Sequence, residues 1–422
     1  MDAQTLYYAI LCFVGLQFLF NHYLGWLNLT HKPSQMPPWA TGIMEEEQYQ
    51  KGLRYQQEYY YFGLFQELLY FGIQFSLLFW GGFGYLADFL ATQFSGWEAQ
   101  VFSFFGIIML FSTLLGLPFS LYGTFVIEEK YGFNKTNLRT FLFDKLKGML
   151  LGIVIGGALG YVFFLLIFTL KAHFWIYFWA VSALFSLVIN VFYTAWILPL
   201  FNKLTPLPEG ELRTAIENYS HSVKFPLHNI FVIDGSKRST KANAFFSGLG
   251  KRKKVVLYDT LLEKYTIDEL VAIFAHEVGH YQKKHIPINL VIGLLQSAAT
   301  LYLLSWFLFT PELSAALGAK QWAIHLNLMA FGMLFSPISF IINLGENYLS
   351  RVFEFQADAY AKATANGEAL ATALKKLSTD NLSNLTPHPW YVAFHYSHPP
   401  LAQRLAALRL PESSNLVTHY AS

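Results

Sequence analysis

Seven long apolar stretches divide this chain of 422 residues. A helix needs about 20 apolar residues to cross a bilayer, because each residue advances it by about 1.5 Å. Only 13% of the residues are charged, against about 25% in ordinary soluble domains. The sequence therefore predicts a mainly α-helical, polytopic membrane protein with seven transmembrane helices. The predicted spans are 5–27, 60–88, 101–127, 148–170, 174–198, 287–309 and 322–344.

The connections between these spans differ in positive charge. Loops 28–59 and 128–147, after spans one and three, hold three and five Lys or Arg residues. The connections after spans two, four and six hold no such residue, Lys171 alone and Lys320 alone. Loops rich in Lys and Arg stay in the cytoplasm. We therefore expect the N-terminus outside and the later extramembrane segments on the cytoplasmic side.

Residues 199–286 interrupt the spans with a folded extramembrane segment. Gly, Pro and Asp turns separate a predicted helix from three predicted strands. The helix covers 209–222, and the strands cover 230–233, 244–246 and 255–258. The sequence thus predicts a small cytoplasmic α+β domain. The expected domains are 1–198 with spans one to five, 199–286 with the α+β segment, 287–344 with spans six and seven, and 345–422 with a C-terminal helical segment.

The charge balance excludes one class of partner. The net charge of +2 is too small for a nucleic-acid-binding protein. The run 251–254 (KRKK) stands at a predicted hairpin beside the membrane, where basic residues face solvent or anionic lipid. The expected partners are a lipid bilayer and the substrate, with no nucleic acid.

Polar residues interrupt several predicted spans. They are Gln66, Glu67, Gln74, Asn190 and Asn343. A carboxylate that faces lipid is costly, so Glu67 is expected to face protein or water. Together these residues predict a hydrated chamber between the helices. Hydrogen bonds between neighbouring helices are the alternative for each residue alone.

The pentapeptide HEVGH at 276–280 closes the α+β segment. His276 and His280 are four residues apart, so they share one face of a helix and can bind one metal ion. Glu277 can act as a base on a water molecule there without being a ligand. Thr266 followed by Glu269 is a capping box, which predicts where the helix begins. The pattern indicates a zinc site, and a chance motif on an ordinary amphipathic helix is the alternative.

Catalytic zinc takes three protein ligands and keeps a position open for water. The third candidate lies after span seven, where a predicted helix carries Glu354 and Asp358 four residues apart. Glu354 completes a His, His, Glu set, and Asp358 can accept the spare ring N–H of a ligand histidine. Glu346 is the rival third ligand. The alternative for the pair is a solvated acidic face.

The C-terminal segment adds a further candidate in HYSHPP at 395–400. Two prolines restrict the chain just after His398. A histidine held in this way can donate a hydrogen bond to the oxyanion of a scissile carbonyl. Arg404 follows on the next predicted helix. A surface histidine in a turn is the alternative.

Six segments of the chain closely resemble the integral-membrane zinc metallopeptidases of the CAAX prenyl protease, a-factor-converting type. HEVGH alone is shared by many zinc peptidases, whereas its combination with seven spans and FEFQAD is specific to this family. The segments are IEEKYGFNKTNL (127–138), LPLFNKLTPL (198–207), VIDGSKRSTKANAFFSGL (232–249), AHEVGH (275–280), SRVFEFQAD (350–358) and HYSHPP (395–400).

The resemblance implies a role for each matched residue. The implied zinc ligands are His276, His280 and Glu354, with Glu277 as the catalytic base. Asn243 and Ala244 match the edge strand along which a substrate extends, and His398 and Arg404 match positions linked to substrate and transition-state contacts. The implied fold is a ring of seven helices around a water-filled chamber, capped by the zinc domain.

The resulting expectation is a zinc-dependent membrane endopeptidase that processes CAAX-type C-termini of peptide or protein substrates, prenylated or associated with the membrane. The alternatives are a quality-control protease for membrane proteins and a transporter or channel with structural zinc. The C-terminus NLVTHYAS shows no dilysine or KDEL-like signal. We therefore expect a bacterial inner membrane, with the endoplasmic reticulum as the alternative.

Overall fold

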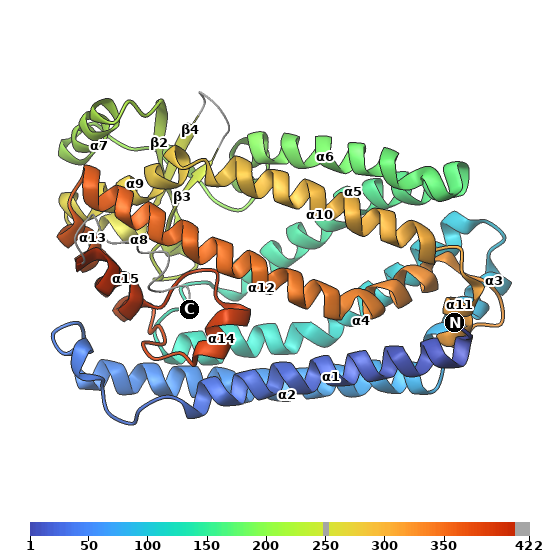
Figure 1. Ribbon diagram of the computed structural model, residues 1–422. Coiled ribbons are helices and arrows are strands. Elements are labelled where there is room, and N and C mark those ends of the chain that lie inside the picture. Colours follow the sequence, from blue (N-terminus) through green and yellow to red (C-terminus); the bar gives the residue numbers. More distant parts are fainter. Residues whose placement is uncertain (248–252, 410–422) are drawn as a thin grey trace.

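The structure is a computed structural model that describes residues 1–247 and 253–409. Long helices run lengthwise through the molecule, and a small sheet with shorter helices caps one of their ends (Figure 1). Two short helices, α3 (Gly82–Gln93) and α11 (Pro311–Ala316), lie at the opposite end. Lys251 and Arg252 of the basic run, and the C-terminus from residue 410 on, lie outside the described residues.

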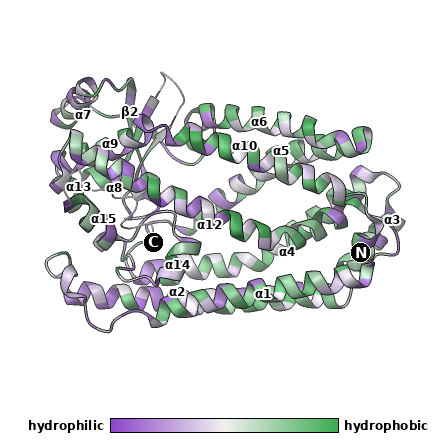
Figure 2. Ribbon diagram, in the orientation of Figure 1, coloured by the Kyte–Doolittle hydropathy of each residue, from purple (hydrophilic) through white to green (hydrophobic). Residues whose placement is uncertain are grey.

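Within the described residues, six helical stretches are long and apolar enough to cross a membrane. One of them, Leu138–Leu200, contains two helices that the short turn η3 (Lys171–His173) separates. Apolar residues concentrate along these helices, whereas the capping end is more hydrophilic (Figure 2). The prediction of a mainly helical, multi-pass membrane protein is confirmed. The helices that follow the predicted spans are α1 (Ala3–Thr30), α2 (Glu46–Phe79), α4 (Trp97–Tyr122), α5 (Leu138–Leu170), α6 (Phe174–Phe192), α10 (His285–Phe307) and α12 (Ile324–Thr364).

Two of these helices end elsewhere than the sequence predicts. Helix α2 stops at Phe79, and Gly81 takes a left-handed φ of 66° in the turn to α3. Glycine adopts this conformation without a steric penalty. Helix α12 does not stop at 344 but continues without a break to Thr364. The expected boundary between residues 344 and 345 thus falls inside one helix, which leads from the membrane into the capping domain.

The long helices pack as a ring. Helix α1 contacts α2 and α12, and α10 contacts α6 and α12. Helix α5 contacts α6, and Trp97 at the start of α4 stacks on Tyr161 and Phe168 of α5. The turn η2 (Gly123–Glu128), which continues α4, contacts α2 and completes the circle. Only 6–17% of the residues in the most apolar window of each candidate span are buried. Most side chains of these windows therefore face lipid or the inside of the ring rather than a packed core.

Polar residues at membrane depth line part of that space. Glu67 keeps 62% of its side chain exposed, and its Oε2 lies 3.4 Å from Nε2 of His22 on α1. Both residues line a cavity of about 830 Å³ between α1, α2 and α14 (Pro389–His395). Asn190 instead donates to the Ser186 carbonyl of its own helix. The cavity agrees with the expected hydrated chamber, whereas the bond of Asn190 lies within its own helix and matches neither the chamber nor the alternative of a bond between helices.

The ring is closed at the end away from the sheet. Helices α3 and α11 pack there against α1, α2, α4 and α12 through one buried apolar cluster. Asn327 of α12 is fully buried, and its amide donates to the carbonyls of Leu308 and Thr310. It also accepts a hydrogen bond from Ser314. These bonds join the start of α12 to the turn between α10 and α11.

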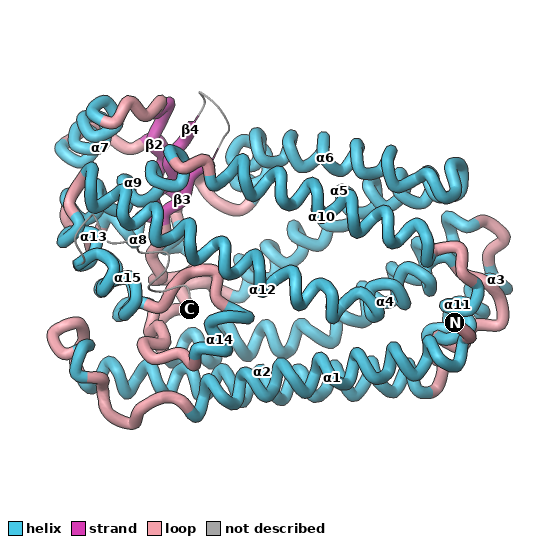
Figure 3. The backbone as a smooth tube through the Cα atoms, in the orientation of Figure 1, coloured by secondary structure: helices cyan, strands magenta, loops and turns pink. Residues whose placement is uncertain are grey.

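The sheet has four strands in the order β1-β2-β4-β3. Figure 3 labels β2, β3 and β4, which lie at the capping end of the long helices. Its central pair, β2 and β4, is parallel, and both outer pairs are antiparallel. The three predicted strands are confirmed, but β1 was missed because Pro206 suggested a chain break. Proline is tolerated on an edge strand, where its missing N–H is not needed. The strands are β1 (Leu204–Pro206), β2 (Leu227–Ile233), β3 (Ala244–Ser247) and β4 (Lys253–Tyr258).

Helix α9 (Ile267–Gln282) carries HEVGH and begins where the sequence predicts. Thr266 and Glu269 form both hydrogen bonds of the capping box. Pro287 by itself indicates a break in the helix at that point, but the chain turns earlier, at Lys284, which has a left-handed φ of 60°. Helix α10 then starts at His285, so Pro287 lies in its first turn, where a missing N–H costs nothing.

One buried apolar core joins the remaining helices to α9. It contains Ile216 of α7, Phe274 of α9, Leu370 of α13 and Leu405 of α15. This core holds α9 beside the C-terminal helices and so fixes where their polar side chains meet. The bounds are α7 (Glu211–Ser222), α8 (Asp259–Leu262), α13 (Gly367–Asp380) and α15 (Leu401–Arg409).

Candidate metal centre and active site

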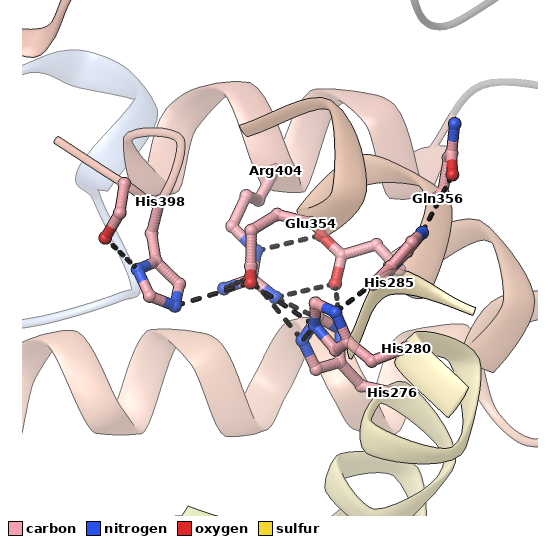
Figure 4. A network of polar contacts seen from close by, with 9 residues as sticks. His276, His280, His285, Glu354, Gln356, His398 and Arg404 are labelled. Carbon is pink, nitrogen blue, oxygen red and sulfur yellow. Dashed lines mark hydrogen bonds and ion pairs between the residues drawn. The ribbon is translucent and has the colours of Figure 1, made fainter. Parts of the chain in front are cut away.

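Three side chains from two helices converge beside the sheet. His276 and His280 of α9 and Glu354 of α12 form the group of possible metal ligands that the described residues contain, with ligand atoms within 4.8 Å of one another. The two Nε2 atoms are 3.2 Å apart. Oε1 of Glu354 lies 3.3 Å from Nε2 of His280, and Oε2 lies 3.5 Å from Nε2 of His276. Figure 4 shows the three side chains pointing toward one another.

These separations fit one tetrahedral zinc ion. Zinc binds histidine nitrogen and carboxylate oxygen at about 2.0–2.2 Å, so two ligands on a tetrahedron are about 3.3 Å apart. Oε2 of Glu354 is buried and has no hydrogen-bond partner among the described residues. Burial acts to lower the pKa of His276. The hydrogen bonds to Asp358 and Glu354 outweigh this effect and raise the pKa to about 10. The surroundings therefore favour a positive charge between these groups, which a zinc ion supplies.

A buried carboxylate fixes the orientation of His276. Oδ1 of Asp358 lies 2.8 Å from Nδ1 of His276, which leaves Nε2 free for the metal. Arg404 of α15 holds Asp358 with two hydrogen bonds, of 2.6 and 2.8 Å. Its Nη1 also lies 3.5 Å from Glu354. Arg404, which we expected to contact substrate, is thus itself buried behind the ligands.

A second chain of hydrogen bonds fixes His280. Nδ1 of His280 lies 3.0 Å from Nδ1 of His285, and Nε2 of His285 lies 2.9 Å from Oε1 of Gln356. The amide oxygen can only accept, so His285 donates from Nε2 and accepts at Nδ1. His280 then donates from Nδ1 and keeps Nε2 free. The His285 ring stacks on Phe353 at a centroid distance of 4.0 Å.

Sequence reasoning gave no role to His285 or Gln356. His285 follows the motif by five residues, and Gln356 lies inside the FEFQAD segment, but neither spacing alone marks a contact. The turn at Lys284 brings His285 back against α9, and that turn carries no strong local signal. The general requirement that a ligand histidine has a partner for its second nitrogen would have prompted a search for one.

Glu277 lies one residue after the first ligand on α9 and is half-buried. Its carboxylate makes no hydrogen bond with the part of the chain that the structure describes. Burial raises the pKa of Glu277, and the nearby imidazoles of His276 and His280 act against this shift. A carboxylate with a raised pKa beside a metal site can accept a proton from water and release it again.

Glu346, the alternative third ligand, is not part of the ligand group. Glu346 precedes Glu354 by eight residues on α12, which is about 12 Å along the helix, and its side chain is exposed. His398, in contrast, reaches the edge of the group. Its Nε2 lies 3.4 Å from Oε1 of Glu354, its Nδ1 contacts Ser397, and 65% of its side chain is exposed.

Asn243 and Ala244 lie where the free edge of the sheet begins. Ala244 pairs with Leu257 of β4, and the other side of β3 has no strand partner in the described sheet. Asn243 is exposed, and its carbonyl accepts from the Tyr258 N–H. An extended peptide can add to such an edge through backbone hydrogen bonds.

The loop before β3 is attached to the membrane helices. Lys241 lies 3.1 Å from Oε2 of Glu128, the last residue of η2. Arg238 donates two hydrogen bonds to Asp144 of α5. Segment 128–147 and the loop before β3 thus contact each other, and together they position the edge strand.

Gly279, inside HEVGH, sets the distance between the two ligand-bearing helices. A Cβ at this position would lie 2.9 Å from Cα and 3.0 Å from O of Ala357 on α12. We expect Gly279→Ala to push α9 from α12, to destabilise the fold by about 1–3 kcal/mol, and to weaken zinc binding at least about tenfold. Zinc titration and thermal unfolding measure both effects. Gly293→Ala on α10, where a Cβ meets open space, is the control; equal zinc affinity of the two variants contradicts this role.

Comparison with known proteins covers nearly the whole chain. Residues 26–203 match the family described as CAAX prenyl protease N-terminal, five membrane helices, and residues 206–412 match peptidase family M48. A CAAX prenyl protease 1 homolog of Oryza sativa subsp. japonica is 35% identical over 419 residues, covering 96% of this chain and 97% of the relative. The CAAX prenyl protease 1 homolog of Homo sapiens is 35% identical, covering 89% of both chains.

A solved structure has a similar fold over nearly the whole chain. The crystal structure of S. mikatae Ste24p matches with a TM-score of 0.91 and 32% sequence identity, covering 96% of this chain and 99% of the other. The ring of spans and the His, His, Glu group define a membrane zinc metallopeptidase. The matches over both parts of the chain then give the family: this chain belongs to the CAAX prenyl protease 1 family of M48 peptidases. The resemblance expected from the sequence is confirmed.

Proposed function

We propose that this zinc endopeptidase removes C-terminal residues from prenylated CAAX-type substrates, with His276, His280 and Glu354 as its zinc ligands. The observation that carries the assignment is the spacing of these three ligands beside a free sheet edge and Glu277, whose carboxylate has no hydrogen-bond partner among the described residues. The bound zinc supplies Lewis-acid chemistry, which polarises the scissile carbonyl and acidifies a water molecule. The side chains of the protein supply the remaining functions.

Glu277 moves the proton in this proposal. Its carboxylate takes a proton from the attacking water and later gives it to the leaving amine. The substrate backbone pairs with β3 from Asn243 and Ala244 onward, which places the scissile bond over the ligand group. His398 donates a hydrogen bond to the developing oxyanion, because its exposed ring reaches the ligand group, 3.4 Å from Oε1 of Glu354.

Asp358 and Arg404 act behind the ligands in this proposal. Asp358 fixes the ring of His276, and Arg404 compensates the buried negative charge of Asp358 and Glu354. Burial would lower the pKa of Arg404, but the two carboxylates raise it, so the guanidinium stays charged. We therefore assign Arg404 to positioning rather than to direct substrate contact.

The charge distribution supports a cytoplasmic active site. The loops rich in Lys and Arg, 28–59 and 128–147, lie at the same end of the helices as the sheet. The far end, with α3, η3 and α11, holds Lys171 and Lys320. By the positive-inside rule the N-terminus is then outside and the zinc site cytoplasmic. The relatives reported above are all eukaryotic, and the bacterial inner membrane, beside the endoplasmic reticulum, stays a prediction.

A pair of matched peptides tests the substrate class. The purified chain in detergent with zinc is given a peptide that ends in a farnesylated CAAX sequence and the same peptide with an unmodified cysteine. We expect release of the C-terminal tripeptide, with kcat/KM at least about tenfold higher for the farnesylated peptide, since each buried CH₂ contributes about 0.8 kcal/mol. Mass spectrometry of the products reads out the bond that is cleaved.

A quality-control protease would behave differently in the same assay. It would cleave both peptides at similar rates and at several bonds, and it would degrade an unfolded membrane protein. That result would contradict the CAAX assignment while leaving the zinc peptidase in place. Chelation of zinc is expected to stop cleavage of either kind.

A further inference from the structure

The polar cavity of about 830 Å³ between α1, α2 and α14 adjoins the active site at two points. Tyr396 lines the cavity, and two residues later His398 contacts Glu354. On the other side the cavity is lined by Glu128, which pairs with Lys241 just before β3. The volume is in the range of sites that enclose a small ligand.

The direction of β3 decides which end of a substrate reaches this cavity. The start of β3 faces the cavity, because Lys241 precedes it and contacts Glu128. A peptide that pairs antiparallel to β3 runs in the opposite direction, so its C-terminal residues follow the scissile bond toward the cavity. For a CAAX-type substrate these are three residues and a terminal carboxylate.

The cavity contains one cation without a partner among the described residues. Glu128 accepts hydrogen bonds from Tyr55 and Tyr59 and pairs with Lys241. Glu67 lies 3.4 Å from His22. Lys32 is the remaining charged lining residue, and none of its contacts within the described ranges is a hydrogen bond or an ion pair. Burial lowers the pKa of Lys32 to about 8, and no carboxylate acts against this shift.

The length of α14 indicates how far Lys32 lies from the residues that follow this helix toward the active site. Asn28, near the end of α1, accepts the backbone N–H of His388, the residue that caps the start of α14. Lys32 therefore lies near the start of α14, and His398 follows its end. The seven residues of α14 span about 10 Å. Three extended residues also span about 10 Å.

We propose that this cavity binds the leaving C-terminal tripeptide of the substrate and that Lys32 binds its terminal carboxylate. The inference rests on the proposed CAAX-type cleavage, whose leaving group carries that carboxylate. Lys32 then selects substrates whose terminal carboxylate lies three residues beyond the cleaved bond. Lys241 and the hydroxyls of Tyr55 and Tyr59 compensate the charge of Glu128, and Glu67 lies 3.4 Å from Nε2 of His22.

Binding of two peptides to the full-length Glu277→Gln protein with zinc tests the inference. Both peptides end in the same farnesylated CAAX sequence, one with a free C-terminal carboxylate and the other with a C-terminal amide. With Lys32 present we expect the carboxylate peptide to bind about 10- to 100-fold more tightly, as for a charge-assisted hydrogen bond. Lys32→Met should remove this preference by weakening only the carboxylate peptide.

Lys51→Met is the matched control, since Lys51 is a half-buried lysine on α2 that lines a different pocket. It should keep the full preference. If Lys32→Met keeps the preference, or weakens both peptides equally as a lysine at lipid headgroups would, the inference is overturned. A failure of the proposed cleavage itself is detected in the cleavage assay, in which the protein that retains Glu277 would release no tripeptide.

Discussion

Glu277→Gln should abolish peptide cleavage while the protein keeps one zinc ion. Glutamine matches glutamate in shape but cannot accept a proton, so the variant loses general-base catalysis. We expect kcat to fall by about 10³-fold or more, toward the upper end of such effects. The zinc content should not change, because Glu277 is not among the three converging ligand atoms. Cleavage assays and metal analysis on the same sample measure both quantities.

Glu263→Gln is the control for this substitution. Glu263 is an exposed glutamate just after α8, outside the ligand group. It should cleave at the rate of the unsubstituted chain. Turnover by Glu277→Gln at more than a few per cent of that rate would show that another group accepts the proton.

Glu354→Ala should remove zinc and activity together. It deletes one of three ligands and removes one of the two carboxylates that Arg404 contacts beside the histidines. The expected loss of zinc affinity exceeds the 10- to 100-fold effect of removing an outer partner of a ligand. Dialysis against a zinc buffer followed by metal analysis gives the affinity.

Glu346→Ala separates the two carboxylates that the sequence offered as third ligand. The side chain of Glu346 is exposed and about two turns away along α12. This variant should retain one zinc ion per chain and full cleavage. Zinc loss in Glu346→Ala with zinc retained in Glu354→Ala would reverse the assignment.

The sequence predicts most of the fold because the relevant signals are local. Spans show as runs of apolar residues, strands as short β-branched runs, and the start of α9 as a capping box. The span boundaries were less predictable. An apolar window does not show that Gly81 turns the chain after α2, or that α12 continues past the membrane as far as Thr364.

The site was predictable where spacing on one helix determines contact. His276 and His280 share a face by periodicity, and so do Glu354 and Asp358. The two pairs meet only because α9 and α12 cross at Gly279, which is a tertiary contact. The contact of His285 with Gln356 and the place of Lys32 in the cavity lining are tertiary as well, so the roles of these residues appear only in the folded chain.

The central claim is that His276, His280 and Glu354 hold the zinc ion that serves catalysis. The most direct measurement is anomalous X-ray scattering from crystals of the zinc-loaded protein, recorded on both sides of the zinc absorption edge. We predict one peak per chain, about 2.0–2.2 Å from Nε2 of both histidines and from a carboxylate oxygen of Glu354. A peak at any other group of residues, or an active crystal without a peak at this site, would contradict the account.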